Sequence, residues 1–151
     1  MSVADRLSEL GLTVPEVVPP VASYVPATRT GNLVYTAGQL PMHDGQLIAA
    51  GKVGGEVTAD EATECARQCA LNALAAVQSV VPLDSVVRVV KAVVFVASTP
   101  DFTGQPGVAN GASNLFGDVF GDTGRHARSA VGVPVLPLDA PVEVELIVEV
   151  G

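Results

Sequence analysis

The stretch "HARSAVGV" places one arginine, Arg128, among small and apolar residues typical of a β-strand. Because side chains alternate along a strand, Arg128 shares its face with Ala130 and Gly132, whose side chains are nearly absent. A guanidinium with free space in front of it can bind a carboxylate through two parallel hydrogen bonds. The alternative is a cross-strand ion pair with Glu143 or Glu145 on an adjacent strand. The pattern by itself leaves both interpretations open.

Other reactive side chains give weaker signals. His126 stands two residues before Arg128 on the same predicted strand face. It is interpreted either as a second acid–base group or as a solvated residue at the start of the strand. His43 falls in a loop and is expected at the surface. Cys65 and Cys69 lie four apart in a predicted helix, without further ligands at metal-binding spacing. We therefore expect buried free thiols and no metal site.

The composition limits the class of protein. A chain of 151 residues fits one domain, and its 48% hydrophobic residues, mostly Val, Ala and Leu, favour a mixed αβ core. The net charge is −8, and the eight Lys and Arg residues are scattered, so nucleic acid is not an expected partner. The sequence contains no run of 18 apolar residues and no secretory h-region. We therefore expect no membrane span and a cytoplasmic location.

Hydrophobic periodicity and turn signals predict an α+β domain over residues 1–151. It begins with an N-terminal helix and proline-rich arm (1–21), followed by a core (22–150). The core elements expected are a hairpin (24–30 and 33–37), a Gly-rich loop (43–57) with a short strand (46–49), a helix from Thr58, a strand (86–97), a helix (107–120) and two final strands. The apolar strand 86–97 is expected to be buried on both faces for much of its length. One sheet with two helices on one face follows from this order.

The last strand, "APVEVELIVEV", alternates between apolar residues and a face bearing Glu143, Glu145, Glu149 and Ile147. A proline-containing "PLD" joins it to the strand of Arg128, and the sequence predicts a hairpin there. In that arrangement Arg128 is the nearest cation to Glu143, and it would keep this carboxylate ionised.

Three segments together resemble the RidA (YjgF) family, also labelled the L-PSP endoribonuclease family. They are "SYVPATRTGNLVYTAGQLP", "VVKAVVFVASTPDF" and "ARSAVGVPVLPLDAPVEVELIVEV", and the resemblance spans residues 22–150. It implies a chorismate-mutase-like fold of the bacillus type. It also implies a homotrimer whose sheets form a central barrel, with sites at the subunit interfaces. The loop after "GQLP" is longer here, which is typical of a divergent subgroup.

The resemblance also implies a function. Family members hydrolyse reactive enamines and imines, such as 2-aminoacrylate, to 2-keto acids and ammonia without a cofactor. By this likeness Arg128 binds the substrate carboxylate, Tyr24 belongs to the cleft, and Glu143 positions the water. The backbone of Gly38 lines the same pocket.

Two positions depart from the family pattern. Ala37 and Ala130 stand where the family's deaminases carry Ser and Cys, although Ala130 keeps the backbone N–H through which the Cys position is thought to act. Both belong to the substrate-binding set that the resemblance implies. Two other hypotheses remain: a non-catalytic module that binds a 2-keto acid or another small carboxylate, and an endoribonuclease. The acidic charge argues against the last.

Overall fold

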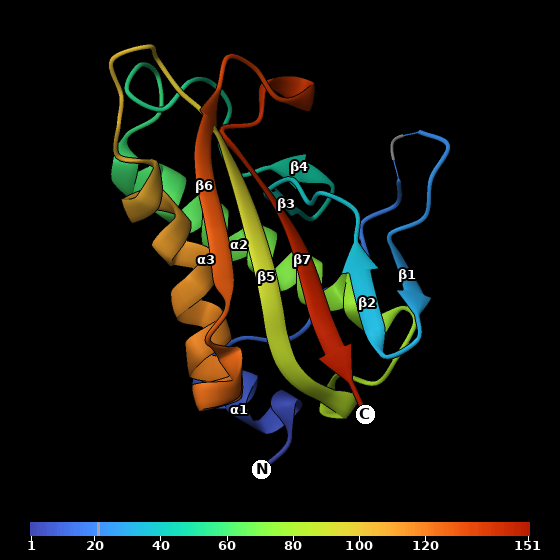
Figure 1. Cartoon of the computed structure of the whole chain (residues 1–151). Helices are drawn as coiled ribbons and strands as arrows, with labels where there is room; N and C mark the ends of the chain where they lie inside the picture. The colour runs from blue at the N-terminus through green and yellow to red at the C-terminus, as the bar shows by residue number, and fades with distance from the viewer. Residues whose placement is uncertain (21) are drawn as a thin grey trace.

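A five-stranded mixed sheet with helices on one face forms the body of the molecule (Figure 1). The computed structural model describes residues 1–20 and 22–151. Val21, the last residue of the expected arm, lies outside the described residues. In chain order the elements are α1 (Val3–Glu9), β1 (Ala27–Thr30), β2 (Leu33–Thr36), β3 (Met42–His43), β4 (Gln46–Leu47), α2 (Ala59–Gln78), β5 (Val86–Ala97), α3 (Gln105–Phe120), β6 (Ala127–Val133) and β7 (Val142–Val150).

The strand order is β1-β2-β7-β5-β6, so β6 is an edge strand. It runs parallel to β5, and every other neighbouring pair in this sheet is antiparallel. The predicted hairpin between the last two strands is therefore wrong. Helix α3 carries the chain back along the sheet, so β6 enters parallel to β5. β7 then pairs with the other side of β5 and with β2.

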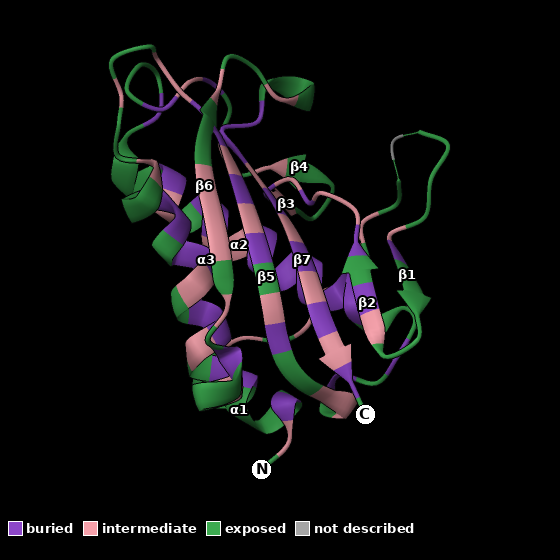
Figure 2. Cartoon of the chain, viewed as in Figure 1, coloured by how far each residue is buried: buried purple, intermediate pink, exposed green. Residues whose placement is uncertain are grey.

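The predicted alternation of β7 is confirmed and decides which face of the sheet is covered (Figure 2). Its apolar residues from Val142 to Val150 are buried, and the intervening residues Glu143 to Glu149 are half-buried. Helices α2 and α3 cover the buried face, as Figure 1 shows. The other face carries the glutamates, and no helix of the described residues covers it. Two core helices on one face were expected, and α1 adds a short third helix packed on α3.

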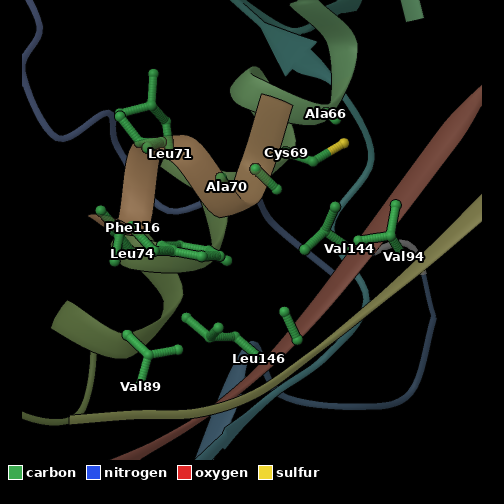
Figure 3. Close-up of a cluster of buried hydrophobic side chains, with 14 of the residues drawn as sticks. Ala66, Cys69, Ala70, Leu71, Leu74, Val89, Val94, Phe116, Val144 and Leu146 are labelled. Atoms are coloured by element: carbon green, nitrogen blue, oxygen red, sulfur yellow. The ribbon is translucent and has the colours of Figure 1, made fainter. Parts of the chain in front are cut away.

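Small residues let the helices approach each other and the sheet closely. Leu74 of α2 and Phe116 of α3 meet Leu146 of β7 in a fully buried cluster (Figure 3). Gly111 of α3 lies against the backbone carbonyl of Thr63 in α2, where a Cβ has no room. The absence of Trp is thus compensated by close packing of Ala, Val and Leu side chains.

The two cysteines are free and buried, as predicted. Burial, reinforced by nearby glutamates, raises the pKa of the Cys65 thiol to about 11. Burial also raises the pKa of Cys69 well above its ordinary value. A thiol with a raised pKa is a poor nucleophile and metal ligand at neutral pH, so both residues serve the core.

Several predicted elements differ in detail, and both β2, at Thr36, and β4, at Leu47, end before the expected residue. The first strand begins at Ala27 rather than at Tyr24, because Pro26 has no N–H to contribute to a ladder. Helix α3 begins at Gln105, two residues before the expected start. Within one chain β5 buries only one face, and Val93 and Phe95 are half-buried on the open face. The expectation that β5 is buried on both faces is therefore not met by one chain.

The Gly-rich segment 43–57 divides into two parts. Its first part pairs as the β3–β4 hairpin. Its second part returns to the end of β5, where the Val53 N–H donates to the carbonyl of Ala97 at 2.8 Å and the Thr99 N–H donates to the carbonyl of Val53 at 3.0 Å. In the described part of the chain, no helix is both long and apolar enough to cross a membrane.

Candidate functional site

Arg128 lies on the helix-covered face of the sheet, because it pairs directly with the buried Ala92 of β5. Its guanidinium is held by three acceptors of α3. Nη1 donates to Asn110 Oδ1 at 2.8 Å and to Ser113 Oγ at 3.2 Å, and Nη2 donates to the carbonyl of Pro106 at 3.3 Å. None of these partners is a carboxylate. The alternative interpretation, an ion pair with Glu143 or Glu145 of β7, is therefore not met among the described residues.

The contacts of Arg128 leave part of the guanidinium available for a ligand. Arginine carries five N–H donors, and three of them are used by α3. The two that remain, on Nε and Nη2, have no acceptor among the described residues. A half-buried cation that is fixed in place but not neutralised attracts an anion, and a carboxylate fits its planar geometry.

His126 helps to fix this arginine. Its Nδ1 lies 2.6 Å from the carbonyl oxygen of Gly124, which can only accept, so Nδ1 carries the proton in the neutral ring. Nε2 then accepts from the hydroxyl of Ser113 at 2.9 Å. The ring also meets the edge of Phe116, with centroids 5.6 Å apart. The Ser113 hydroxyl is thereby oriented with a lone pair towards Arg128.

The open space expected beside Arg128 is partly filled. A Cβ on Gly132 would lie 2.8 Å from Nε2 of Gln105 and 3.0 Å from Oγ of Ser98. The side chain of Gln105 therefore occupies the far end of this strand face. Ala130, between Gly132 and Arg128, is half-buried and keeps the small side chain that the strand pattern predicted.

Glu143 and Gly38 form the second group of site residues. A Cβ on Gly38 would lie 2.7 Å from Cδ and 2.9 Å from Oε1 of Glu143, so only glycine lets the carboxyl group pack here. The neighbouring Gln39 holds the segment on β7 through two backbone hydrogen bonds with Val144, of 2.8 and 3.0 Å. Burial, and secondarily the charge of Glu145, raises the pKa of Glu143. The pKa of this carboxyl group therefore lies above that of an exposed glutamate.

A pocket of about 640 Å³ surrounds Glu143 and Gly38. Tyr24 lines it too, although it precedes β1 instead of belonging to it. Ala37 lies outside this pocket and lines a shallower hollow that it shares with Tyr24. The described residues that line the larger pocket include the acidic groups Glu16, Asp44 and Glu143 but no Lys or Arg. Apart from His43, which lies against Asp44, the described lining of this pocket offers no basic side chain to a ligand.

Asn72 is a residue of this site that the sequence interpretation missed. It is 1% exposed, and its Nδ2 donates to the carbonyls of Leu40 and Met42, both at 3.0 Å. These bonds attach the pocket wall to helix α2. The available signal was an amide side chain on the apolar face of that helix, where a buried polar group needs partners.

The structure places the predicted site residues in two groups. Tyr24, Gly38 and Glu143 line one pocket. Arg128 and Ala130 lie on the edge strand β6, on the opposite sheet face from Glu143. The expectation that Arg128 keeps Glu143 ionised is wrong within one chain. Among the described residues, no three or more His, Cys, Asp or Glu side chains are grouped as metal ligands.

Comparisons with known proteins identify the family. The chain is 45% identical to protein TCP17 of Trypanosoma cruzi, over 99% of this chain and 94% of that protein. It is 46% identical to Atu1372 of Agrobacterium tumefaciens, a protein with unknown function, with a TM-score of 0.92 over 99% of this chain and 93% of the other. A putative endoribonuclease of Shewanella oneidensis is 29% identical with a TM-score of 0.96, over 99% of this chain and 100% of the other. Residues 15–150 match the family described as Endoribonuclease L-PSP, and the chain belongs to this family.

Proposed function

We propose that this protein is an enamine/imine deaminase that hydrolyses 2-imino acids to 2-keto acids and ammonia. The observation that carries the proposal is the set of hydrogen-bond partners around the Arg128 guanidinium. Its guanidinium is fixed by Asn110, Ser113 and the Pro106 carbonyl, yet no carboxylate neutralises it among the described residues. The substrate carboxylate takes that place. Membership of the L-PSP family supports the proposal.

The active site is completed by a neighbouring copy of the chain in a homotrimer. Arg128 belongs to an edge strand on one sheet face, and the Glu143 pocket opens elsewhere, so one chain cannot bring the two groups to one small molecule. The open face of the sheet supports assembly, because Val93 and Phe95 lie half-buried there and Val131 is exposed. A closed ring of three identical contacts satisfies both requirements.

The reaction needs positioning more than strong acids or bases. Arg128 holds the carboxylate, and Glu143, as a carboxylate, accepts a proton from water while the water oxygen bonds to the imine carbon. The C=N electron pair moves to nitrogen, which receives the proton back from Glu143. Glu143 then transfers the hydroxyl proton of the carbinolamine to its amino group, which leaves as ammonia while the C=O bond forms. The raised pKa of Glu143 makes this carboxylate a stronger base than an exposed glutamate, which favours uptake of the water proton.

The alanines at two family positions are compatible with this chemistry. Ala130 lies two residues from Arg128 on the same strand face and keeps its backbone N–H. Ala37 has no hydroxyl for the substrate, and its N–H donates to the Pro26 carbonyl at 2.8 Å. We propose that carboxylate binding rests on Arg128 with the backbone near Ala130.

The test generates imines in place with an amino-acid oxidase and follows keto-acid formation with and without the protein. The reaction is supported if the wild-type protein accelerates keto-acid formation and if Arg128→Lys and Glu143→Gln each lose this acceleration. Lysine keeps the charge but not the two-pronged geometry, so Arg128→Lys also loses 2-oxobutyrate binding. Binding without any acceleration would instead support the non-catalytic module. Cleavage of RNA would support the endoribonuclease, which the net charge of −8 opposes.

A further inference from the structure

We infer that the substrates are 2-imino acids with bulky, uncharged, mainly apolar side chains, and that the proline-rich N-terminal arm selects them. This inference rests on the proposed function and specifies its substrate class. It is carried by the size, the walls and the charge of the pocket around Glu143.

The pocket is too large for the smallest imines. Its volume is about 640 Å³. A three-carbon imino acid occupies on the order of 100 Å³, a few times the share of a water molecule in the liquid. A pocket of several hundred cubic ångströms is typical of ligands with a substantial apolar part. A substrate with three carbons would leave most of this space to water.

The arm supplies an apolar wall. Val17 and Val18 line the pocket, flanked by Pro15 and Pro19. Proline fixes φ and excludes helix, so this wall is held in an extended form before a ligand binds. A preformed wall loses little conformational entropy on binding. Met42 adds an apolar side chain that adapts its shape to different ligands.

The charges of the pocket set a second limit. Glu16, Asp44 and Glu143 line it, and no Lys or Arg does so among the described residues. His43 is engaged with Asp44, its Nε2 lying 3.3 Å from Oδ2. A substrate whose side chain carries its own carboxylate is repelled by these three carboxyl groups. The pocket therefore accepts the uncharged side chain of the substrate, and Arg128 of a neighbouring copy binds the α-carboxylate of the substrate.

The experiment compares imines of matched shape. Amino-acid oxidases supply the imines derived from alanine, leucine, phenylalanine and aspartate, the last nearly isosteric with that from leucine. Protein-dependent keto-acid formation is measured in competition with semicarbazide. Because each buried methylene is worth about fourfold, kcat/KM for the leucine-derived imine is expected to exceed that for the alanine-derived imine at least about tenfold. The aspartate-derived imine is expected to be the poorest substrate.

A variant connects this selectivity with the arm. Val18→Phe fills part of the pocket and is expected to reduce kcat/KM for the leucine- and phenylalanine-derived imines at least about tenfold, and to reduce it less for the alanine-derived imine. Thr13→Phe is the matched control, because Thr13 is exposed on the same arm and does not line the pocket. Equal losses for all imines in Val18→Phe would overturn the selective role of the arm.

The outcomes separate this inference from the proposed reaction. Hydrolysis of the alanine-derived imine as fast as that of the leucine-derived imine overturns the substrate class and keeps the reaction. If no imine is hydrolysed, binding of 4-methyl-2-oxopentanoate, pyruvate and oxaloacetate is measured by calorimetry. Tighter binding of 4-methyl-2-oxopentanoate then supports the apolar preference while the reaction fails. Equal or absent binding overturns both.

Discussion

Arg128 and Glu143 project from opposite faces of one sheet, with β5 between their strands. Arg128 pairs with Ala92, and Glu143 pairs with Phe95 three residues further along β5. Directly paired residues point to the same face, and odd separations along a strand reverse the face. The two groups that the proposed chemistry needs together are thus kept apart by the fold of a single chain.

This separation predicts complementation between inactive subunits. Arg128→Ala and Glu143→Gln are each expected to abolish imine hydrolysis alone. In trimers co-expressed from both variants, a site is intact where the first variant supplies Glu143 and the second supplies Arg128. Random assembly restores about a quarter of all sites, which corresponds to about one site in three within the trimers that contain both variants. Activity is measured on hybrids purified through two different tags, and sedimentation of the wild type is expected to give a trimer of the 15.3 kDa chain. Fully inactive hybrids would place both groups in one chain.

Ser113 is expected to act through Arg128. Ser113→Ala removes the acceptor of one Nη1 hydrogen bond and the partner of His126, so the guanidinium is less well fixed. We expect 2-keto acid binding to weaken about three- to tenfold, in line with the loss of a hydrogen bond to a charged group. Calorimetric titration measures this change, and KM should rise more than kcat falls. Asn114→Ala, at the exposed next position of α3, should bind like wild type. Unchanged binding in Ser113→Ala would mean that Asn110 and Pro106 suffice.

Gly38 is expected to be required for the placement of Glu143. In Gly38→Ala the new Cβ meets the Glu143 carboxyl at 2.7 Å, so that side chain must move. We expect at least about a tenfold loss of kcat with a loss of folding free energy of about 1–3 kcal/mol, typical of overpacking. Steady-state kinetics and thermal unfolding measure the two effects. Gly117→Ala is the control, because its Cβ has open space within a helix and should slightly stabilise the fold. Full activity in Gly38→Ala would show that Glu143 tolerates displacement.

The pH dependence of kcat/KM is expected to report Glu143. As the base, Glu143 must be ionised, so activity falls as the pH drops through its pKa, which burial raises above the ordinary 4.5. The charge of Glu145 adds to this rise. Glu145→Gln is therefore expected to lower the pKa of Glu143 and move the acidic limb to lower pH, with little change near neutral pH. Glu149→Gln, whose charge does not contribute to the pKa of Glu143, should leave the limb in place. If the acidic limb of the pH profile does not move in Glu145→Gln, that limb belongs to a group other than Glu143.

Local patterns were sufficient to predict most elements of this fold. The alternation of "VEVELIVEV" predicted the buried and glutamate-bearing faces of β7, and Thr58 caps α2 by accepting from the Glu61 N–H at 3.1 Å. Strand β5 has the predicted bounds, and the turn at Gly31-Asn32 joins β1 and β2. These features depend on neighbours within a few residues, so the sequence itself encodes them.

The sequence by itself determined that Arg128 shares a strand face with Ala130, and that β7 presents Glu143 on a face without the buried valines. Only the tertiary structure decided what surrounds these groups. The position of β6 beside β5 follows from the crossover through α3, and it directs Arg128 to Asn110 and Ser113 rather than to a glutamate. Contacts between residues far apart in sequence depend on strand order and on the packing of helices against the sheet. No short-range periodicity specifies that geometry.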